Sequence, residues 1–212
     1  SFRDDWHFCV RNRRRDLAEV WPGARRAGAG ESRCRVVVDG PNDSLDSLGM
    51  LLVAAMSAAE QHITVLTPYF LPSREMVAAL QTAALRGVLV NVVLPQRSNL
   101  RYVDWATRKV LPELIHRGVR VYLQPPPFAH TKLFLVDGVY SLIGSANMDP
   151  RSLRLNFELM VEVFCPGLGA ELTRYARDIC ARSTIVTAAE LDTRPVVTKA
   201  RDSVAWLFSP YL

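Results

Sequence analysis

The sequence contains no long apolar run. Among its 212 residues, no stretch approaches the ~20 uninterrupted apolar residues that a membrane-spanning helix needs. It also lacks a phosphate-binding loop, because the short run Gly28-Ala29-Gly30 has neither a further glycine nor a preceding strand. These absences argue against a membrane span within this sequence and against a P-loop nucleotide enzyme.

Cysteine is scarce, and its spacing does not indicate metal binding. No Cys-x-x-Cys pair occurs among the four cysteines, which are Cys9, Cys34, Cys165 and Cys180. With few histidines near them, they predict neither a zinc site nor a disulfide framework. We therefore expect reduced thiols in a protein that faces the cytoplasm.

Neither sign of charge dominates. The 26 basic and 21 acidic residues give a net charge of +5, which only weakly favours anionic partners. An apolar fraction of 49% is enough for a sizeable core. Since the sequence begins with Ser1 in the middle of a pattern, we expect a piece of a longer protein. Residues 1–31 would be the tail of a preceding domain or a linker, and residues 32–212 one domain.

Apolar strands alternate with helical patterns through the middle of the sequence. The patterns predict strands over residues 34–39, 63–67, 88–94 and 119–123, and helices over residues 45–61, 73–86 and 102–116. Pro112 lies inside the last of these helices and is expected to kink or divide it. Further helices are expected near residues 168–182 and 188–191, before an apolar tail, residues 205–212, that packs on the domain. This alternation is typical of an α/β sheet with helices on its faces, where ligands gather at strand ends.

Reactive side chains are concentrated between residues 130 and 158. His130 and Lys132 sit two apart at the start of an apolar run, so on a strand they would leave by the same face. The turn after the next apolar run, and a third run over residues 155–164, add the polar residues Ser145, Asn147, Arg151, Asn156 and Glu158. Three short strands would deliver this mixture to one region, and packing alone does not require it.

These residue types suit phosphoryl transfer. A neutral histidine is a competent nucleophile or general base at about pH 7, and a carboxylate that holds its second nitrogen fixes its tautomer. His130 is the candidate for the first role and Glu158 for the second. Lys132, Ser145 and Asn147 supply donors for phosphate oxygens, where the charge of the transition state lies. Since no aspartate cluster suited to Mg²⁺ accompanies them, we expect a phosphodiester reaction through a phosphohistidine, without metal or cofactor.

The spacing of these residues resembles a known signature. The segments HTKLFLVDG, GSANMDPRS and NFE, which begin at His130, Gly144 and Asn156, resemble the HKD signature of the phospholipase D superfamily. From about residue 32 to the end, the sequence is similar to the C-terminal half of bacterial cardiolipin synthases. Other segments that carry this similarity are Thr67-Pro68-Tyr69-Phe70, Arg86-Gly87-Val88 and Ser209-Pro210.

The resemblance implies an α/β fold, a phospholipase D-like mixed β-sheet flanked by helices on both faces. It also implies that two HKD motifs meet at one active site and transfer a phosphatidyl group between phospholipids through a phosphohistidine. Carried over by residue, it makes His130 catalytic and assigns phosphate binding to Lys132 and Asn147. Ser145 would support them, and Glu158 would orient His130.

Three further residues have open roles. Asp137 belongs to the motif and is grouped with the catalytic residues, although its place at a strand end fits a structural role better. Tyr69 would line the path of the acyl chain or head group, or serve as a core aromatic. Arg151 would pair with a second phosphate or with a neighbouring carboxylate.

The sequence holds one HKD motif where the resemblance implies two. His7, His62 and His116 lack the following lysine and aspartate, so none of them supplies the second. The second half would come from the same longer polypeptide, or from a second copy in a homodimeric single-HKD phosphodiesterase or nuclease. A third alternative is a non-catalytic lipid-binding or scaffolding remnant.

The resemblance also implies partners and a location. We expect an anionic phospholipid such as phosphatidylglycerol as substrate, a second HKD half, and a membrane surface, whereas nucleic acid is not expected. The chain would be peripheral at the cytoplasmic face of the inner membrane.

Overall fold

The computed structural model of the chain describes residues 30–41 and 46–211. The chain divides into two compact units, Ser1–Ser32 and Arg33–Leu212, and almost all described residues belong to the second. The predicted tail, residues 1–31, lies almost wholly outside the described residues. So does the predicted start of a helix at Leu45.

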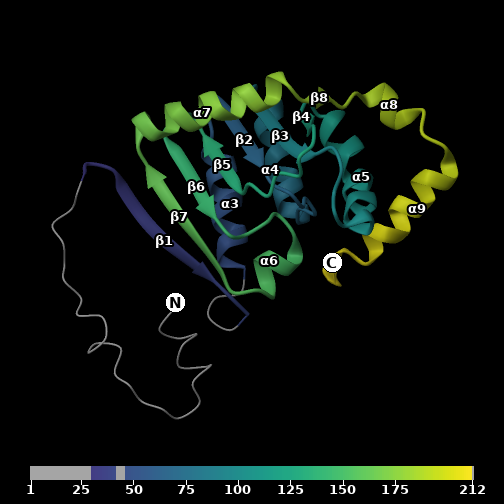
Figure 1. The fold of residues 1–212 in the computed structure, drawn as a ribbon, viewed down its shortest axis with the longest axis horizontal. Helices are drawn as coiled ribbons and strands as arrows, with labels where there is room; N and C mark the ends of the chain where they lie inside the picture. The colour runs from purple at the N-terminus through teal and green to yellow at the C-terminus, as the bar shows by residue number, and fades with distance from the viewer. Residues whose placement is uncertain (1–29, 42–45, 212) are drawn as a thin grey trace, which may run out of the picture. The chain divides into compact units, whose positions relative to one another are not determined.

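Eight strands of the described part form one mixed β-sheet, in the order β1-β7-β6-β5-β2-β3-β4-β8 (Figure 1). In chain order the strands are β1 (Arg33–Asp39), β2 (His62–Leu66), β3 (Leu89–Pro95), β4 (Arg120–Gln124), β5 (Leu133–Val136), β6 (Tyr140–Gly144), β7 (Glu158–Phe164) and β8 (Thr184–Ile185). Pairing is parallel between β2 and β3 and between β3 and β4, and antiparallel between all other neighbours.

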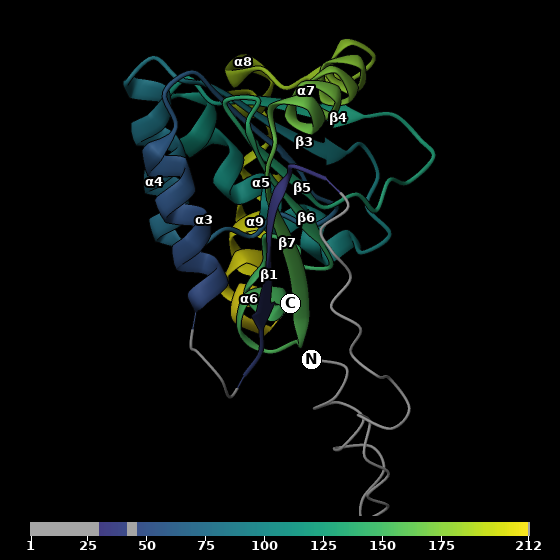
Figure 2. The same ribbon diagram turned by 90° about the vertical axis from the view of Figure 1, so that its left-hand side faces the viewer.

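Helices cover both faces of this sheet. They are α3 (Ser47–Ala58), α4 (Arg74–Leu85), α5 (Arg101–Ile115), α6 (Pro150–Arg154), α7 (Pro166–Ala181), α8 (Ala188–Asp192) and α9 (Val196–Leu207), followed by the 3-10 turn η1 (Ser209–Tyr211). α4 and α5 connect the parallel strands, which need crossovers of about a dozen residues or more. Figure 2 shows α3 and α4 side by side on one face of the sheet. Within the described part, no helix is long and apolar enough to cross a membrane.

Alternation along β5 explains how the two faces are filled. Phe134 and Val136 belong to the main apolar core, together with residues of α3, α4 and α5. Leu133 and Leu135 point to the opposite face, where they pack with Ile179 of α7. Burial on both faces accounts for the uninterrupted apolar sequence of this strand.

The predicted fold class is confirmed: the chain is an α/β protein with a mixed sheet between helices. The four strands predicted before residue 124 occur with ends that differ by one residue at most. α5 runs through Pro112 as one helix, contrary to a division there. Pro112 lies in the last turn, and the buried Val110, Leu111 and Leu114 around it hold that turn against the core.

The strand predicted over residues 155–164 starts later than expected, and a short helix precedes it. Residues 150–154 form α6, which begins because the Asp149 side chain accepts from the backbone N of Ser152 at 2.7 Å and Pro150 occupies its first turn. Leu155 caps its end. β7 therefore begins only at Glu158, and Asn156 lies before it.

The predicted apolar tail is mostly helix and packs only in part. α9 occupies residues 196–207, and its inner side carries Asp202 and Trp206. Leu207 is 74% exposed and Phe208 is 56% exposed, so the expected packing of these two side chains is wrong. The helical turn at this point directs Trp206 inward and Leu207 and Phe208 outward.

Candidate active site

Most of the predicted site residues gather at one edge of the sheet. His130 and Lys132 immediately precede β5. Ser145 and Asn147 follow β6, and Glu158 is the first residue of β7. β6 is antiparallel to both β5 and β7, so the start of β5, the end of β6 and the start of β7 meet at the same edge.

The His130 ring lies against the Lys132 ammonium. Nζ of Lys132 is 3.1 Å from Nδ1 and 3.2 Å from Nε2 of the ring, and it donates to the backbone oxygen of His130 at 3.2 Å. Burial first, and then the charge of Lys132, lower the pKa of His130 below its ordinary value. The imidazole is therefore neutral at about pH 7, the form that can attack an electrophile or accept a proton.

Opposing influences act on Lys132. Burial lowers the pKa of its ammonium, while the carboxylates of Glu158 and Asp149 raise it, and the lowering is the larger effect. Lys132 thus lies beside an imidazole and within the field of two carboxylates. From this position it can contact the oxygens of an anionic group that approaches His130.

Two side chains hold the Glu158 carboxylate. Oγ of Ser145 donates to Oε2 of Glu158, and Nδ2 of Asn156 donates to Oε1 at 3.2 Å. The backbone N of Ser145 donates to the backbone oxygen of Leu159 at 3.0 Å, which fixes Ser145 beside the start of β7. The bond from Glu158 to His130 that the resemblance implies is not among the hydrogen bonds of the described residues. Ser145 and Asn156 occupy the two carboxylate oxygens instead.

The start of α6 holds Asn147 and presents Arg151. Nδ2 of Asn147 donates to Oγ of Ser152 at 3.1 Å, and its Oδ1 is buried without a hydrogen-bond partner among the described residues. Turning the amide by half a turn would place Nδ2 at that position, where a phosphate oxygen could accept from it. Burial raises the pKa of the neighbouring Asp149, although its bonds to Ser152 oppose this. The exposed Arg151 forms no ion pair with a described residue, so the predicted carboxylate partner is not found.

Aromatic rings line another side of His130. The ring of Tyr69 stands edge-on to that of His130, with centroids 6.1 Å apart, and the ring of Phe128 is 5.9 Å away. The Tyr69 hydroxyl donates to Oδ1 of Asn99 at 2.8 Å, and the ring also packs against a small apolar cluster. Phe128 and Asn99 were not predicted from the sequence as site residues. The proline-rich run just before His130 was the signal that could have indicated Phe128.

Asp137 lies at the opposite end of β5 from His130. Its carboxylate accepts from three consecutive backbone N–H groups, those of Glu60, Gln61 and His62, at 2.9, 2.8 and 2.7 Å. Burial raises the pKa of Asp137, but these donors outweigh it and hold the pKa below its ordinary value. Asp137 therefore ties β5 to the start of β2 and does not join the cluster around His130.

Comparison with known proteins places this site in a family. Residues 52–179 match the family model described as "Cardiolipin synthase, PLD-like domain". The chain belongs to this family. The resemblance to the phospholipase D superfamily, and to cardiolipin synthases within it, is thereby confirmed.

Curated members of the cardiolipin synthase family are similar over most of the chain. Cardiolipin synthase A of Serratia proteamaculans is 38% identical over 178 residues, which are 84% of this chain and 37% of that protein. Cardiolipin synthase A of Yersinia pseudotuberculosis is 35% identical over the same shares. The chain thus spans little more than a third of the length of these relatives.

Solved structures share the fold of this PLD-like domain. Nuc of Salmonella typhimurium, a phospholipase D family member, aligns with a TM-score of 0.63 at 22% identity, over 74% of this chain and 99% of Nuc. Phosphatidylserine synthase of Haemophilus influenzae aligns with a TM-score of 0.68 at 17% identity, over 85% of this chain and 48% of that chain. At such identities the likeness shows the fold alone.

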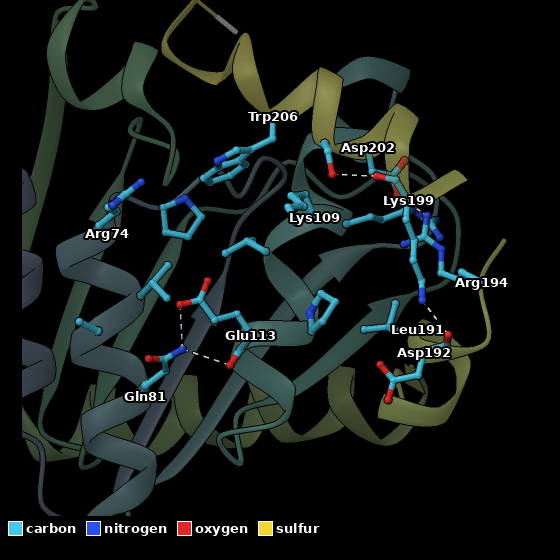
Figure 3. Close-up of a pocket in the computed structure, with 17 residues that line it drawn as sticks. Arg74, Gln81, Lys109, Glu113, Leu191, Asp192, Arg194, Lys199, Asp202 and Trp206 are labelled. Atoms are coloured by element: carbon cyan, nitrogen blue, oxygen red, sulfur yellow. Dashed lines mark hydrogen bonds and ion pairs between the residues drawn. The ribbon is translucent and has the colours of Figure 1, made fainter. Parts of the chain in front are cut away.

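A separate cavity lies on the helical side of the PLD-like domain. It has a volume of about 630 Å³ and lies between α4, α5, α8 and α9 (Figure 3). Lys109 and Glu113 of α5 and Lys199 and Trp206 of α9 line it, and no predicted site residue does. Among the described residues, no group of three or more histidine, cysteine, aspartate or glutamate side chains is placed to hold a metal ion.

Proposed function

We propose that this chain supplies half of the active site of a cardiolipin-synthase-type phosphatidyltransferase. The observation that carries the proposal is the neutral imidazole of His130, 3.1 Å from the Lys132 ammonium and at the same sheet edge as the Ser145–Glu158 pair. Membership of the cardiolipin synthase PLD-like family supports phospholipid chemistry at this site.

The proposed reaction passes through a phosphohistidine. A ring nitrogen of one of two histidines attacks the phosphorus of a phospholipid such as phosphatidylglycerol. A P–N bond forms while the P–O bond to the leaving alcohol breaks, and the other histidine gives its proton to the leaving oxygen. The hydroxyl of a second phospholipid then attacks phosphorus, the second histidine takes its proton, and the P–N bond breaks. His130 is one of the two histidines.

The neighbours of His130 have defined tasks in this proposal. Lys132 and the amide of Asn147 donate to the non-bridging phosphate oxygens and stabilise the charge that gathers there. Ser145 and Asn156 hold Glu158 at the edge of β7, where its carboxylate keeps the Lys132 ammonium charged against the effect of burial. Tyr69, beside the imidazole, would contact the head group or the start of an acyl chain. Arg151 would reach a second phosphate.

The second histidine has to come from another PLD-like half. An uncovered apolar face of β1, β7 and β6 lies beside Ser145 and supports this pairing. The register places its exposed side chains on one side of the sheet: Val36, Val38, Ile143 and Leu159. α7 covers the neighbouring part of that side over β5, and no described element covers these four residues. We propose that the other half, which belongs to the same longer polypeptide, docks on this face.

The location follows the substrate. An enzyme that joins two phospholipids works at a lipid surface, and we propose that this domain is peripheral at the cytoplasmic face of the inner membrane. A homodimeric phosphodiesterase remains the second candidate, because the chain itself carries a single HKD motif.

The experiment that tests the proposal measures transfer from labelled phosphatidylglycerol. The chain is assayed alone and together with the upstream half of its polypeptide, and the protein is then examined for label on histidine. Transfer that requires the upstream half, with acid-labile label on histidine, is the expected result. Label on His130 in the chain alone, together with a stable dimer, would favour the phosphodiesterase.

Variants of two exposed histidines make the test specific. His130→Ala should abolish transfer in every pairing. His116→Ala is the matched control, because His116 is exposed at the far end of α5, where its ring lies 3.2 Å from a carboxylate oxygen of Asp192. Undiminished transfer by His130→Ala would refute the assignment of the site.

A further inference from the structure

The outer side of α9 is apolar and exposed to solvent. Its large apolar side chains and their exposed fractions are Val196 80%, Val197 81%, Val204 56%, Leu207 74% and, at the cap, Phe208 56%. Isolated exposed apolar residues are normal on a protein surface, but contiguous groups of them mark interaction sites. Five on one short helix form such a group.

Helical geometry places these residues on one face. At about 100° per residue, the five side chains together with Ala200 fall within an arc of about 120°. The opposite side faces the domain. Asp202 is 1% exposed, and Ala205 and Trp206 pack against a small apolar cluster between α5 and the loop that follows β2. Figure 3 shows Lys199, Asp202 and Trp206 on the side of α9 that lines the cavity. α9 is therefore anchored by the side that carries Asp202, Ala205 and Trp206, while no described element covers its outer apolar side.

Cations border the apolar arc on both sides. Lys199 lies at one border, where its ammonium donates to the backbone oxygen of Asp192 at 2.7 Å. Arg201 lies at the other, where its guanidinium pairs with Asp202 at 2.7 Å and stacks over the ring of Trp105 at 4.5 Å. An apolar stripe with lysine and arginine at its margins is the pattern of a helix that lies in a lipid interface, since cations at that depth meet phosphate head groups.

We propose that the outer face of α9, Val196 to Phe208, binds the surface of an anionic lipid bilayer. The apolar arc would enter the boundary between head groups and acyl chains, with Lys199 and Arg201 at the level of the phosphates. The end of α9 leads into η1, which lies against α6, and α6 follows the turn that carries Ser145 and Asn147 (Figure 1). The C-terminal end of α9 is thus connected through η1 and α6 to the turn at the site edge. The inference does not depend on the chemistry of His130.

Vesicle flotation tests this inference directly. The chain is mixed with vesicles of phosphatidylcholine, with or without phosphatidylglycerol as one third of the lipid. We expect binding to the vesicles that contain phosphatidylglycerol, weaker binding to pure phosphatidylcholine, and a decrease with salt. Leu207→Glu should lower the partition coefficient by about tenfold or more, equivalent to about 1.4 kcal/mol.

The chain offers a matched control for this substitution. Leu85, at the end of α4, is 68% exposed, so Leu85→Glu makes the same chemical change on another helix. It should leave vesicle binding unchanged, and circular dichroism should show both variants folded. Replacing Lys199 with Glu should also weaken binding, but only to the anionic vesicles.

Three outcomes would overturn the proposal. One is a wild-type chain that does not bind anionic vesicles, and another is an equal loss of binding in the Leu207 and Leu85 variants. The third is a concentration-dependent oligomer that Leu207→Glu abolishes, since this would assign the α9 face to a second copy of the chain. Hydrogen exchange adds an independent readout, because vesicles should protect α9 in His130→Ala as fully as in the wild type.

Discussion

Replacement of Asp137 separates a structural from a catalytic role for the aspartate of the HKD motif. The carboxylate accepts three backbone hydrogen bonds from residues 60–62, at 2.7 to 2.9 Å, far along β5 from His130. Asp137 also has a φ of 52°, in the left-handed region where a β-carbon is strained but aspartate and asparagine are tolerated. Both features act on folding and neither on the reacting phosphate.

The structure sets the size of the expected loss. A hydrogen bond to a charged group contributes about 1.5–3 kcal/mol, and the exposure of Glu60 and Gln61 places their bonds to Asp137 at or below the lower end. Asp137→Ala removes all three bonds and adds left-handed strain of about 1 kcal/mol, so it should lower the free energy of unfolding by about 3–5 kcal/mol. Asp137→Gly removes the same bonds but adds no strain, so its loss of unfolding free energy should be about 1 kcal/mol smaller than that of Asp137→Ala.

Asparagine at this position should have an intermediate effect. It tolerates the backbone angle and keeps one oxygen, which can still accept from Gln61 and His62, but its amide faces the N–H of Glu60. We expect Asp137→Asn to lower the free energy of unfolding by about 1–2 kcal/mol. Because the pKa of Asp137 is lowered in the folded state, its contribution is complete above the unfolded carboxyl pKa of about 3.9. The contribution is lost as the pH falls through the lower, folded pKa.

Urea unfolding of the wild type and the three variants, at neutral pH and again in the acid range, measures these differences. Phosphatidyl transfer, corrected for the folded fraction, is measured in parallel with the upstream half. Stability should fall in the order wild type, Asn, Gly, Ala, with transfer per folded molecule retained. An Asn variant as stable as the wild type but without transfer would refute the structural role.

Three further predictions concern the site and the core. Lys132→Gln should raise the pKa of His130, because the substitution removes the nearby positive charge that lowers this pKa. An NMR titration of the imidazole should show the rise, and an unchanged or lower pKa would contradict the contact between the two side chains. Glu158→Gln should lower the free energy of unfolding by about 1–3 kcal/mol, measured by urea unfolding, because the NH2 group of glutamine would face a donor, Ser145 or Asn156, where a carboxylate oxygen accepted. Full stability of this variant would mean that these bonds are absent. Tyr140→Phe should lower it by about 1.5–3 kcal/mol because the hydroxyl donates at 2.8 Å to the buried carboxylate of Glu162, and a thermal melt that matches the wild type would disprove this.

Hydrophobic periodicity and residue propensity predicted the α/β class and the strands before residue 124, whereas the mixed sheet was expected from the family resemblance. β3 is apolar on both faces, and Ser73 caps α4 with its side chain, so sequence alone marks both elements. α6 was not predicted, because its five residues are followed directly by the apolar run over residues 155–164, which has the pattern of a strand. Asp149 followed by Pro150 is a helix-start signal, but a helix of five residues is too short to show a helical period.

The sequence predicted that most of the candidate site residues lie together, but it misplaced Asp137 and did not predict the contacts. Spacing alone suggested that His130 and Lys132 share a region, and antiparallel pairing of β5, β6 and β7 brings Ser145 and Glu158 to them. Which group each carboxylate oxygen binds depends on the exact start of β7, which periodicity does not resolve. Phe128 escaped prediction for a similar reason, since its ring reaches His130 through the path of a loop.

The two exposed apolar surfaces lie on opposite sides of the sheet and should therefore act independently. Leu159 is on the side that α7 partly covers, whereas α9 packs on α5, which belongs to the core of the other side. If both proposals hold, a second PLD-like half and a lipid bilayer would be bound at the same time, with the His130 edge between them. We expect Leu159→Glu to abolish pairing with the upstream half, measured by co-purification, and to leave vesicle binding intact. Leu207→Glu should do the reverse, and a single variant that abolishes both would mean that the two surfaces serve one partner.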